Sequence, residues 1–311
     1  MNPDARIYVA GAGTMAGTAL TRVLRDEGFT AIVGTDAIEP DLVNQGAVDA
    51  FFERERPEYV FLLAGRTAGI GGNQRFPADL MIETLTIASH VIPAAWRAGV
   101  RKLLYLSSSC TYPKLAPQPL EPSAFWTGPV EPTSAAYAVA KLAGATLCDA
   151  YRRQYGARFF TAISADAYGP GDDYSTEDAH VVGALLRRMH DARVNSAPEV
   201  VGWGTGAPRR EFIYVDDLAS ACLFAMLHYE GDQPINLGTG RDTSIRELAE
   251  AIREVVGYTG TLRFDASKPD GMPFKGLDSS VLHGLGWRAQ WDLKRGLERT
   301  YAEYLKLGIE N

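Results

Sequence analysis

Apolar positions along residues 1–165 alternate between two spacings. Short runs of apolar and β-branched residues predict strands at 7–10, 31–33, 59–63, 102–106 and 158–163. Between these runs, apolar residues recur at helical spacing and predict helices at 17–26, 48–54, 80–97 and 135–155. Strands that alternate with helices in this way are typical of βαβ units. We therefore expect an α/β fold with a Rossmann-like, doubly wound parallel sheet.

The pattern changes after residue 165, where loops rich in Gly, Pro and charged residues separate the apolar segments. We expect a helix near 180–190, a short strand at 199–201 and a further helix over the apolar stretch 213–227. The last of these returns the chain to the first sheet. The predicted domains are therefore discontinuous, with a larger one of residues 1–165 plus 213–240 and a smaller α/β one of residues 166–212 plus 241–311.

Composition narrows the class of partner. The 311 residues carry a net charge of −7 and contain no basic run, which argues against binding to nucleic acid or to an anionic membrane. No segment approaches the roughly 20 apolar residues of a membrane span, and the N-terminus lacks the apolar region of a signal peptide. We therefore expect a cytoplasmic protein with a small-molecule partner.

Three cysteines are spread widely along the chain, at Cys110, Cys148 and Cys222. An odd number at such spacing fits a reducing cytoplasm better than a disulfide framework, and it matches no metal-ligand pattern. Cys148 and Cys222 lie in apolar helical segments and are expected in the core. Cys110 instead follows a strand and stands among serines, so it is a candidate for chemistry.

The strand at 7–10 runs into the sequence GAGTMAG (11–17), which begins a helix. Residues without a Cβ let backbone N–H groups at a helix N-terminus approach a pyrophosphate closely, so this context indicates a dinucleotide site in the larger domain. The candidate cofactor-binding residues in this loop are Gly11, Gly13, Thr14, Met15 and Gly17.

Residues after the second predicted strand bear on the choice of dinucleotide. Asp36 lies 19 residues after Gly17, where a carboxylate accepts hydrogen bonds from the adenosine ribose and repels a 2′-phosphate. Neither Arg nor Lys occurs in residues 35–45, and Ala12 and Gly13 supply no positive charge. These residues favour NAD(H) over NADP(H).

A tyrosine and a lysine stand one helical turn apart in the helix predicted at 135–155. Tyr137 and Lys141 have the i, i+4 spacing that places both side chains on one face. A lysine cation within about 6 Å, together with an oxidised nicotinamide ring, lowers the pKa of a tyrosine by about one to three units. Ser108 follows the strand that begins at residue 102, so we expect it at the carboxyl edge of the sheet, hydrogen bonded to a reacting oxygen.

These features resemble the extended short-chain dehydrogenase/reductase superfamily and, within it, the GDP-L-fucose synthase family. Among the segments that carry the resemblance are SSCTYPKLAPQPL (108–120), EPTSAAYAVAKLAG (131–144) and VVGWGTGAPRREFIYVDDLA (200–219). The resemblance spans nearly the whole chain. It implies a homodimeric enzyme, with a dinucleotide-binding domain and a nucleotide-sugar domain, that epimerises C3 and C5 of a GDP-4-keto-6-deoxy sugar and then reduces C4 with NADPH.

The resemblance also implies roles for individual side chains. Ser108, Tyr137 and Lys141 match the reductase triad, while Cys110 and His180 match the acid/base pair of epimerisation. A C–H beside a ketone is acidic because the enolate places charge on the carbonyl oxygen, and a partly ionised thiol suits its removal. Lys141 and His180 also match cofactor contacts, and the implied substrate contacts are Arg188, Trp203, Arg210, Lys268 and Asp270.

Three departures from the family pattern keep alternatives open. The basic residues that hold the 2′-phosphate of NADPH in the family are absent, Asp166 stands where the family has an amide, and Glu83 and Thr84 replace a glutamine and an asparagine. The first alternative is an NAD-dependent nucleotide-sugar epimerase or dehydratase that holds its cofactor tightly. A remote alternative is a non-catalytic cofactor-sensing protein.

Overall fold

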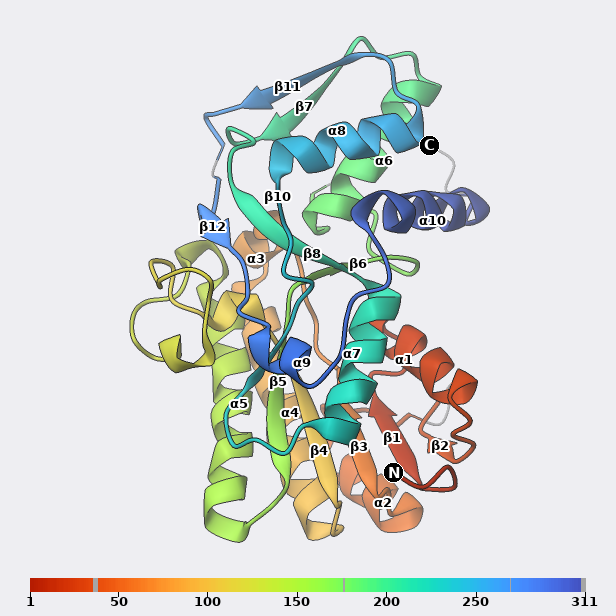
Figure 1. Cartoon of the computed structure of the whole chain (residues 1–311), viewed down its shortest axis with the longest axis vertical. Coiled ribbons are helices and arrows are strands. Elements are labelled where there is room, and N and C mark those ends of the chain that lie inside the picture. The colour runs from red at the N-terminus through yellow and green to blue at the C-terminus, as the bar shows by residue number, and fades with distance from the viewer. Residues whose placement is uncertain (36–38, 176, 269, 309–311) are drawn as a thin grey trace.

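The computed structural model describes residues 1–35, 39–175, 177–268 and 270–308. Its main layer is a parallel sheet of six strands in the order β2-β1-β3-β4-β5-β9 (Figure 1). The strands are β1 (Ile7–Ala10), β2 (Ile32–Val33), β3 (Tyr59–Leu62), β4 (Lys102–Ser108), β5 (Phe159–Ser164) and β9 (Ile235–Leu237). The strand order reverses at β1, and open α/β sheets bind ligands at the carboxyl ends of strands beside such a switch point.

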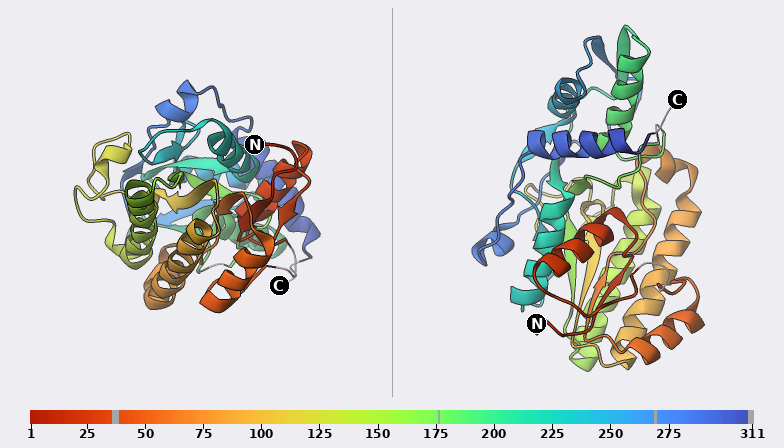
Figure 2. Two further views of the ribbon diagram at one scale, coloured as in Figure 1. Left: turned by 90° about the horizontal axis from the view of Figure 1, so that it is seen from below. Right: turned by 90° about the vertical axis from the view of Figure 1, so that its right-hand side faces the viewer.

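Helices cover both faces of this sheet, as Figures 1 and 2 show. On one face α1 (Met15–Asp26) packs against α7 (Val215–His228). The other face carries α2 (Gln45–Glu55), α4 (Pro77–Arg97) and α5 (Ala135–Tyr155). Because the sheet is covered on both sides, β1 and β5 are buried along their whole length, and their apolar side chains enter two separate clusters.

The other strands form a smaller lobe beyond the carboxyl edge of the main sheet (Figure 1). In this lobe β8 (Arg209–Tyr214) pairs with β6 (Asp166–Tyr168), β10 (Asp242–Ser244) and β12 (Phe274–Lys275), and β7 (Glu199–Trp203) pairs with β11 (Thr261–Asp265). A third apolar cluster forms around α6 (Val181–Val194), α8 (Ile245–Val256) and α10 (Leu293–Lys306). In the right-hand view of Figure 2, the dark blue α10 runs across the base of the smaller lobe.

Two shorter helices lie near the junction of the two parts. They are α3 (Ile70–Arg75), which precedes α4, and α9 (Ser280–Gly284), which packs on β9. Leu277, Leu282 and Trp287 near α9 join the apolar cluster of the main sheet, although they were assigned to the smaller domain. The domain boundaries drawn from the sequence stay a prediction.

The strands and helices predicted within residues 1–165 are present, with ends that differ by a few residues. The α/β class and the doubly wound parallel sheet are confirmed. The prediction that the helix of residues 213–227 begins at Ile213 is wrong. Ile213 and Tyr214 complete β8, and the helix begins at Val215. A continuous apolar run has the same composition in a buried strand and a buried helix. Over the described part of the chain, no helix is both long enough and apolar enough to cross a membrane.

Candidate functional site

The glycine loop joins β1 to α1 and leaves no room for side chains on its inner side. Gly11 has φ of 91°, and a Cβ there would lie 2.8 Å from the backbone of Ala64. A Cβ at Gly17 would overlap the Gly11 carbonyl, whereas Gly13 has open space around it. Thr14 caps α1, with its Oγ1 3.0 Å from the Gly17 N–H that donates to it, and Met15 begins the helix. This narrow turn at a helix N-terminus fits the pyrophosphate of a dinucleotide.

Glu39 places an acid at the glycine loop that the sequence analysis did not single out. Its carboxylate accepts a hydrogen bond from the Gly11 N–H, and the Tyr8 hydroxyl donates to it at 3.5 Å. Burial raises the pKa of Glu39, and the hydrogen bond from Gly11 offsets part of that effect. Asp36, the expected ribose contact, lies outside the described residues. The carboxylate that the structure does place at the end of β1 is therefore that of Glu39.

The predicted triad converges at the carboxyl edge of the sheet. Ser108 ends β4, and Tyr137 and Lys141 lie at the start of α5, which packs against β4. The Tyr137 hydroxyl is hydrogen bonded to the side chains of Ser108 and Thr67. Lys141 Nζ lies 6.0 Å from the centre of the Tyr137 ring and donates to the Leu106 carbonyl at 2.9 Å. The three side chains thus lie close together, although Tyr137 and Lys141 come from α5 and Ser108 comes from β4.

In the chain alone the pKa of Tyr137 is raised, and its lowering beside Lys141 and an oxidised nicotinamide stays a prediction. Burial raises the pKa of Tyr137 far above its usual value, the nearby Cys110 raises it further, and hydrogen bonds with Thr67 and Ser108 offset only part of the rise. Burial also lowers the pKa of Lys141 to about 8, so the ammonium that should attract the phenolate is itself disfavoured. Tyr137 is a neutral phenol in this state and is suited to donate a proton.

Cys110 and His180 line one cavity between the two lobes. Cys110 lies in a short turn at 109–111 and is partly exposed, and its N–H donates to Ser108 Oγ at 3.2 Å. His180 precedes α6, and its Nε2 shares a hydrogen bond with Thr67 Oγ1 at 2.9 Å. Burial lowers the pKa of His180, so the ring is neutral near neutral pH. Because Thr67 also bonds to Tyr137, one hydroxyl connects the imidazole to the phenol.

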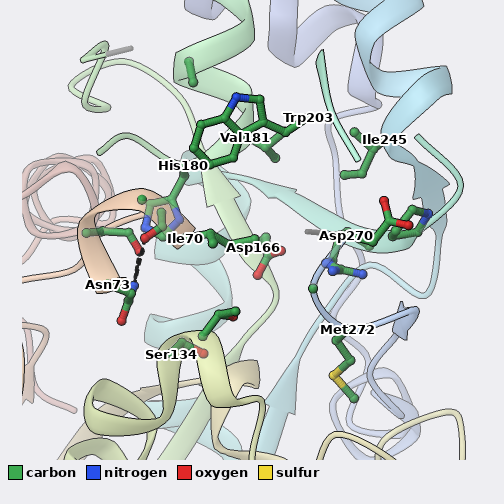
Figure 3. Close-up of a pocket in the computed structure, with 18 of the residues that line it drawn as sticks. Ile70, Asn73, Ser134, Asp166, His180, Val181, Trp203, Ile245, Asp270 and Met272 are labelled. Atoms are coloured by element: carbon green, nitrogen blue, oxygen red, sulfur yellow. Dashed lines mark hydrogen bonds between the residues drawn. The ribbon is translucent and has the colours of Figure 1, made fainter. Parts of the chain in front are cut away.

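Asp166 and Lys275 form an ion pair in the same cavity. Lys275 Nζ lies 2.7 Å from Asp166 Oδ1 and 3.9 Å from Cys110 Sγ. Burial alone would raise the pKa of Asp166, but the ammonium outweighs it and holds that pKa below its usual value. The pKa of Lys275 is raised because the attraction of Asp166 outweighs burial. Figure 3 shows Asp166 and His180 directed into the same space.

Two of the expected substrate contacts lie over the indole of a third, Trp203, at the end of β7. Trp203 is 38% exposed and lines the cavity, as Figure 3 shows. Arg188 Cζ lies 5.9 Å and Lys268 Nζ 5.7 Å from the centre of its ring. Cations stacked on an indole suit a site that takes both a flat base and phosphates.

Arg210 and Asp270 also line the cavity, but they make contacts within the chain. Arg210 is 9% exposed, and one of its N–H groups donates to the Arg209 carbonyl at 2.8 Å. Asp270 accepts from the N–H of Thr205 at 2.7 Å and from its hydroxyl at 2.9 Å. Asp270 therefore fixes the loop that follows Trp203. Arg188, Trp203, Arg210 and Asp270 thus line the cavity, and Lys268 lies over the Trp203 ring. Their roles as ligand contacts stay a prediction.

Three site residues were missed from the sequence. Thr67 and Glu39 follow β3 and β2, so the rule that strand ends carry functional residues pointed to both positions. Lys275 had no such signal, because it lies 165 positions from Cys110 and only the pairing of β12 with β8 brings it into the cavity. Cys148 and Cys222 are buried, as expected.

Comparisons with known proteins agree with one another. The NAD dependent epimerase/dehydratase family matches residues 7–238. The chain is 48% identical to GDP-L-fucose synthase 1 of Arabidopsis thaliana over 303 residues, which is 97% of this chain and 94% of that protein. A GDP-6-OMe-4-keto-L-xylo-heptose reductase from C. jejuni superposes with a TM-score of 0.93 at 34% identity, covering 99% of both chains. A GDP-L-fucose synthetase from Naegleria fowleri bound to NADP superposes with a TM-score of 0.89 at 25% identity, covering 98% of this chain and 95% of that one. The two structural matches therefore cover both lobes.

Proposed function

The chain belongs to the NAD dependent epimerase/dehydratase family and, within it, to the GDP-L-fucose synthases, and we propose that it epimerises C3 and C5 of a GDP-4-keto-6-deoxy sugar and then reduces C4. It is an NAD(P)-dependent epimerase/reductase. The observation that carries the proposal is the convergence of Ser108, Cys110, Tyr137 and His180 on one cavity between the two lobes. That arrangement supplies a carbonyl-binding pair and two groups able to move protons.

Epimerisation needs a site that stabilises charge on the ketone oxygen. The Ser108 and Tyr137 hydroxyls are hydrogen bonded to each other and are suited to hold the C4 oxygen while an enolate forms. Cys110 accepts the proton from carbon as a thiolate. His180, neutral in the free chain, would first take up a proton and then give one to the enolate carbon from another wall of the cavity, which returns the ring to its neutral form. Repeating the exchange at C3 and C5 inverts both centres.

Reduction of C4 uses the same oxygen contacts. The glycine loop of residues 11–17 and Lys141 would hold a reduced nicotinamide cofactor, which would supply the hydride. Tyr137 is protonated in the free chain because burial raises its pKa, so it delivers a proton to the alkoxide. The Thr67 hydroxyl bonded to both Tyr137 and His180 gives a route for replacing that proton.

We infer that NADH serves this chain at least as well as NADPH. The N. fowleri structure bound to NADP supports the opposite choice. Here the loop GAGTMAG has no basic side chain, and the Glu39 carboxylate lies at the Gly11 N–H, where it would repel a 2′-phosphate. Measuring kcat/KM with each cofactor tests this, and Glu39→Gln should improve the value for NADPH more than that for NADH. A large NADPH preference in the unaltered chain would contradict the inference.

Homodimeric assembly and a cytoplasmic location are also part of the proposal. Large apolar side chains remain exposed on α4 and α5, with Ile82 at 62%, Trp96 at 39%, Val139 at 38% and Tyr155 at 47%. Such residues on two neighbouring helices support an interface between two copies of the chain. Light scattering at micromolar concentration tests this, and a monomer would contradict it.

Turnover stoichiometry tests the proposed reaction. Incubated with GDP-4-keto-6-deoxymannose, the protein should oxidise one reduced nicotinamide for each GDP-sugar reduced. An epimerase or dehydratase that retains its cofactor would convert the sugar without consuming added cofactor. A protein that only senses the cofactor would leave the sugar unchanged, so each outcome identifies a different function.

A further inference from the structure

We propose that Lys275 is a positioning residue for Cys110, holding an ammonium group beside the sulfur so that the thiolate is available as the base of epimerisation. This proposal rests on the proposed function. Lys275 ends β12, whose register with β8 places it opposite Arg210. Its Nζ lies 3.9 Å from Cys110 Sγ, and the residue is 9% exposed. The cation therefore acts on the sulfur with little screening by water.

Asp166 fixes this cation in place. Its Oδ1 lies 2.7 Å from Lys275 Nζ and accepts a weaker hydrogen bond from Ser109 Oγ at 3.4 Å. Asp166 begins β6, and both β6 and β12 pair with β8, so the backbone hydrogen bonds of one sheet set the distance between the two charges. An ammonium left unpaired at this depth would be strongly disfavoured, so the carboxylate keeps Lys275 charged.

The acid at position 166 thereby acquires a function of its own. Asp166 stands where the family has an amide side chain. From the sequence, this difference left the identity of the cofactor and of the sugar open. The structure connects it instead to Lys275 and, through the ammonium, to Cys110. We assign the pair Asp166–Lys275 to the epimerisation half of the reaction.

The step that Lys275 assists is the transfer of one proton from a sugar carbon to the sulfur of Cys110. The C–H bond beside the ketone breaks, an S–H bond forms on Cys110, and the electron pair of the C–H bond moves into the enolate. The ammonium of Lys275 stabilises the sulfur as an anion before the transfer and does not itself gain or lose a proton. Other charged or titratable groups that face the pair are Arg210 on β8, His180 before α6 and Tyr137 on α5.

Alkylation of the free protein by iodoacetamide tests the proposal without substrate or cofactor. Mass spectrometry of the Cys110 peptide gives the rate as a function of pH, and the buried Cys148 and Cys222 serve as slow internal references. Lys275→Met should slow alkylation near neutral pH by about tenfold, while Lys275→Arg should retain most of the rate. Lys294→Met, which removes an exposed lysine on α10, is the matched control and should alkylate like the unaltered protein.

The double variant Asp166→Asn with Lys275→Met covers the case in which Lys275→Met does not fold, since it leaves no unpaired charge behind. It should alkylate as slowly as Lys275→Met. A folded variant of either kind that alkylates at the unaltered rate would overturn the proposal. If alkylation slows as expected but the unaltered protein does not turn over the GDP-sugar, the proposed function fails while the effect of Lys275 on the thiol stands.

Discussion

Replacing Tyr137 by phenylalanine removes one hydroxyl from the centre of the site and keeps the buried ring. Two neighbours lose a hydrogen bond, but each keeps another partner. Ser108 Oγ still accepts from the Cys110 N–H at 3.2 Å, and Thr67 Oγ1 still bonds to His180 Nε2 at 2.9 Å. No buried group is left unpaired, so the free energy of unfolding should fall by only about 1 kcal/mol.

The effect on turnover should be much larger. A positioned acid that protonates the alkoxide contributes about 10²–10⁴-fold, and at about 1.4 kcal/mol per tenfold this raises the barrier by about 3–5 kcal/mol. The same hydroxyl is suited to hold the enolate oxygen, so Tyr137→Phe should slow both the loss of reduced nicotinamide and deuterium exchange at the sugar. Single-turnover measurements at saturating cofactor separate this loss from weaker binding.

Tyr258→Phe is the matched control. The Tyr258 hydroxyl donates to the Ala197 carbonyl at 3.0 Å within the apolar cluster of the smaller lobe, so its removal costs similar stability away from the cavity. Denaturant unfolding should show comparable losses for the two variants, with turnover reduced only in Tyr137→Phe. A folded Tyr137→Phe protein that turns over within threefold of the unaltered one would refute the assignment of Tyr137 as proton donor.

Two further predictions concern Cys110 and Asp166. Cys110→Ser should leave C4 reduction measurable but slow deuterium entry at C3 and C5 by about 10²-fold, and exchange at the unaltered rate would remove Cys110 from the mechanism. Asp166→Asn should lower the free energy of unfolding by about 1–3 kcal/mol near neutral pH, less than for a fully buried pair because the Asp166 side chain is 30% exposed. The folded-state pKa of Asp166 is lowered, so its contribution is present above the unfolded pKa of about 4 and is lost as pH falls below it. Urea unfolding should therefore show the two proteins converging in acid, and a difference that persists there would contradict the ion-pair account.

The parts that the sequence predicted well depend on short stretches of chain. The glycine loop needs a strand, a turn without side chains and a helix start, and all three lie within residues 7–26. Helical spacing alone places Tyr137 and Lys141 on one face of α5. The end of a strand places Ser108 at the carboxyl edge of the sheet. Such patterns are visible in a single sequence because each one determines its own local geometry.

The parts that it predicted poorly depend on contacts between distant strands. β6, β10 and β12 have two or three residues each and gain their structure from pairing with β8. Lys275 enters the cavity only through that pairing, and Thr67 acquires its role by lying between Tyr137 and His180. The rise of the Tyr137 pKa in the chain alone could not be read from the sequence for a related reason, since the effect of burial depends on the completed fold.

The most direct test of the account is the isotopic composition of the product formed in heavy water with unlabelled reduced cofactor. The account predicts two carbon-bound deuterium atoms from solvent, at C3 and C5, and protium at C4 delivered by the cofactor. Product with no solvent deuterium at C3 and C5 would show that the sugar is only reduced. Deuterium at C4 would contradict direct hydride transfer.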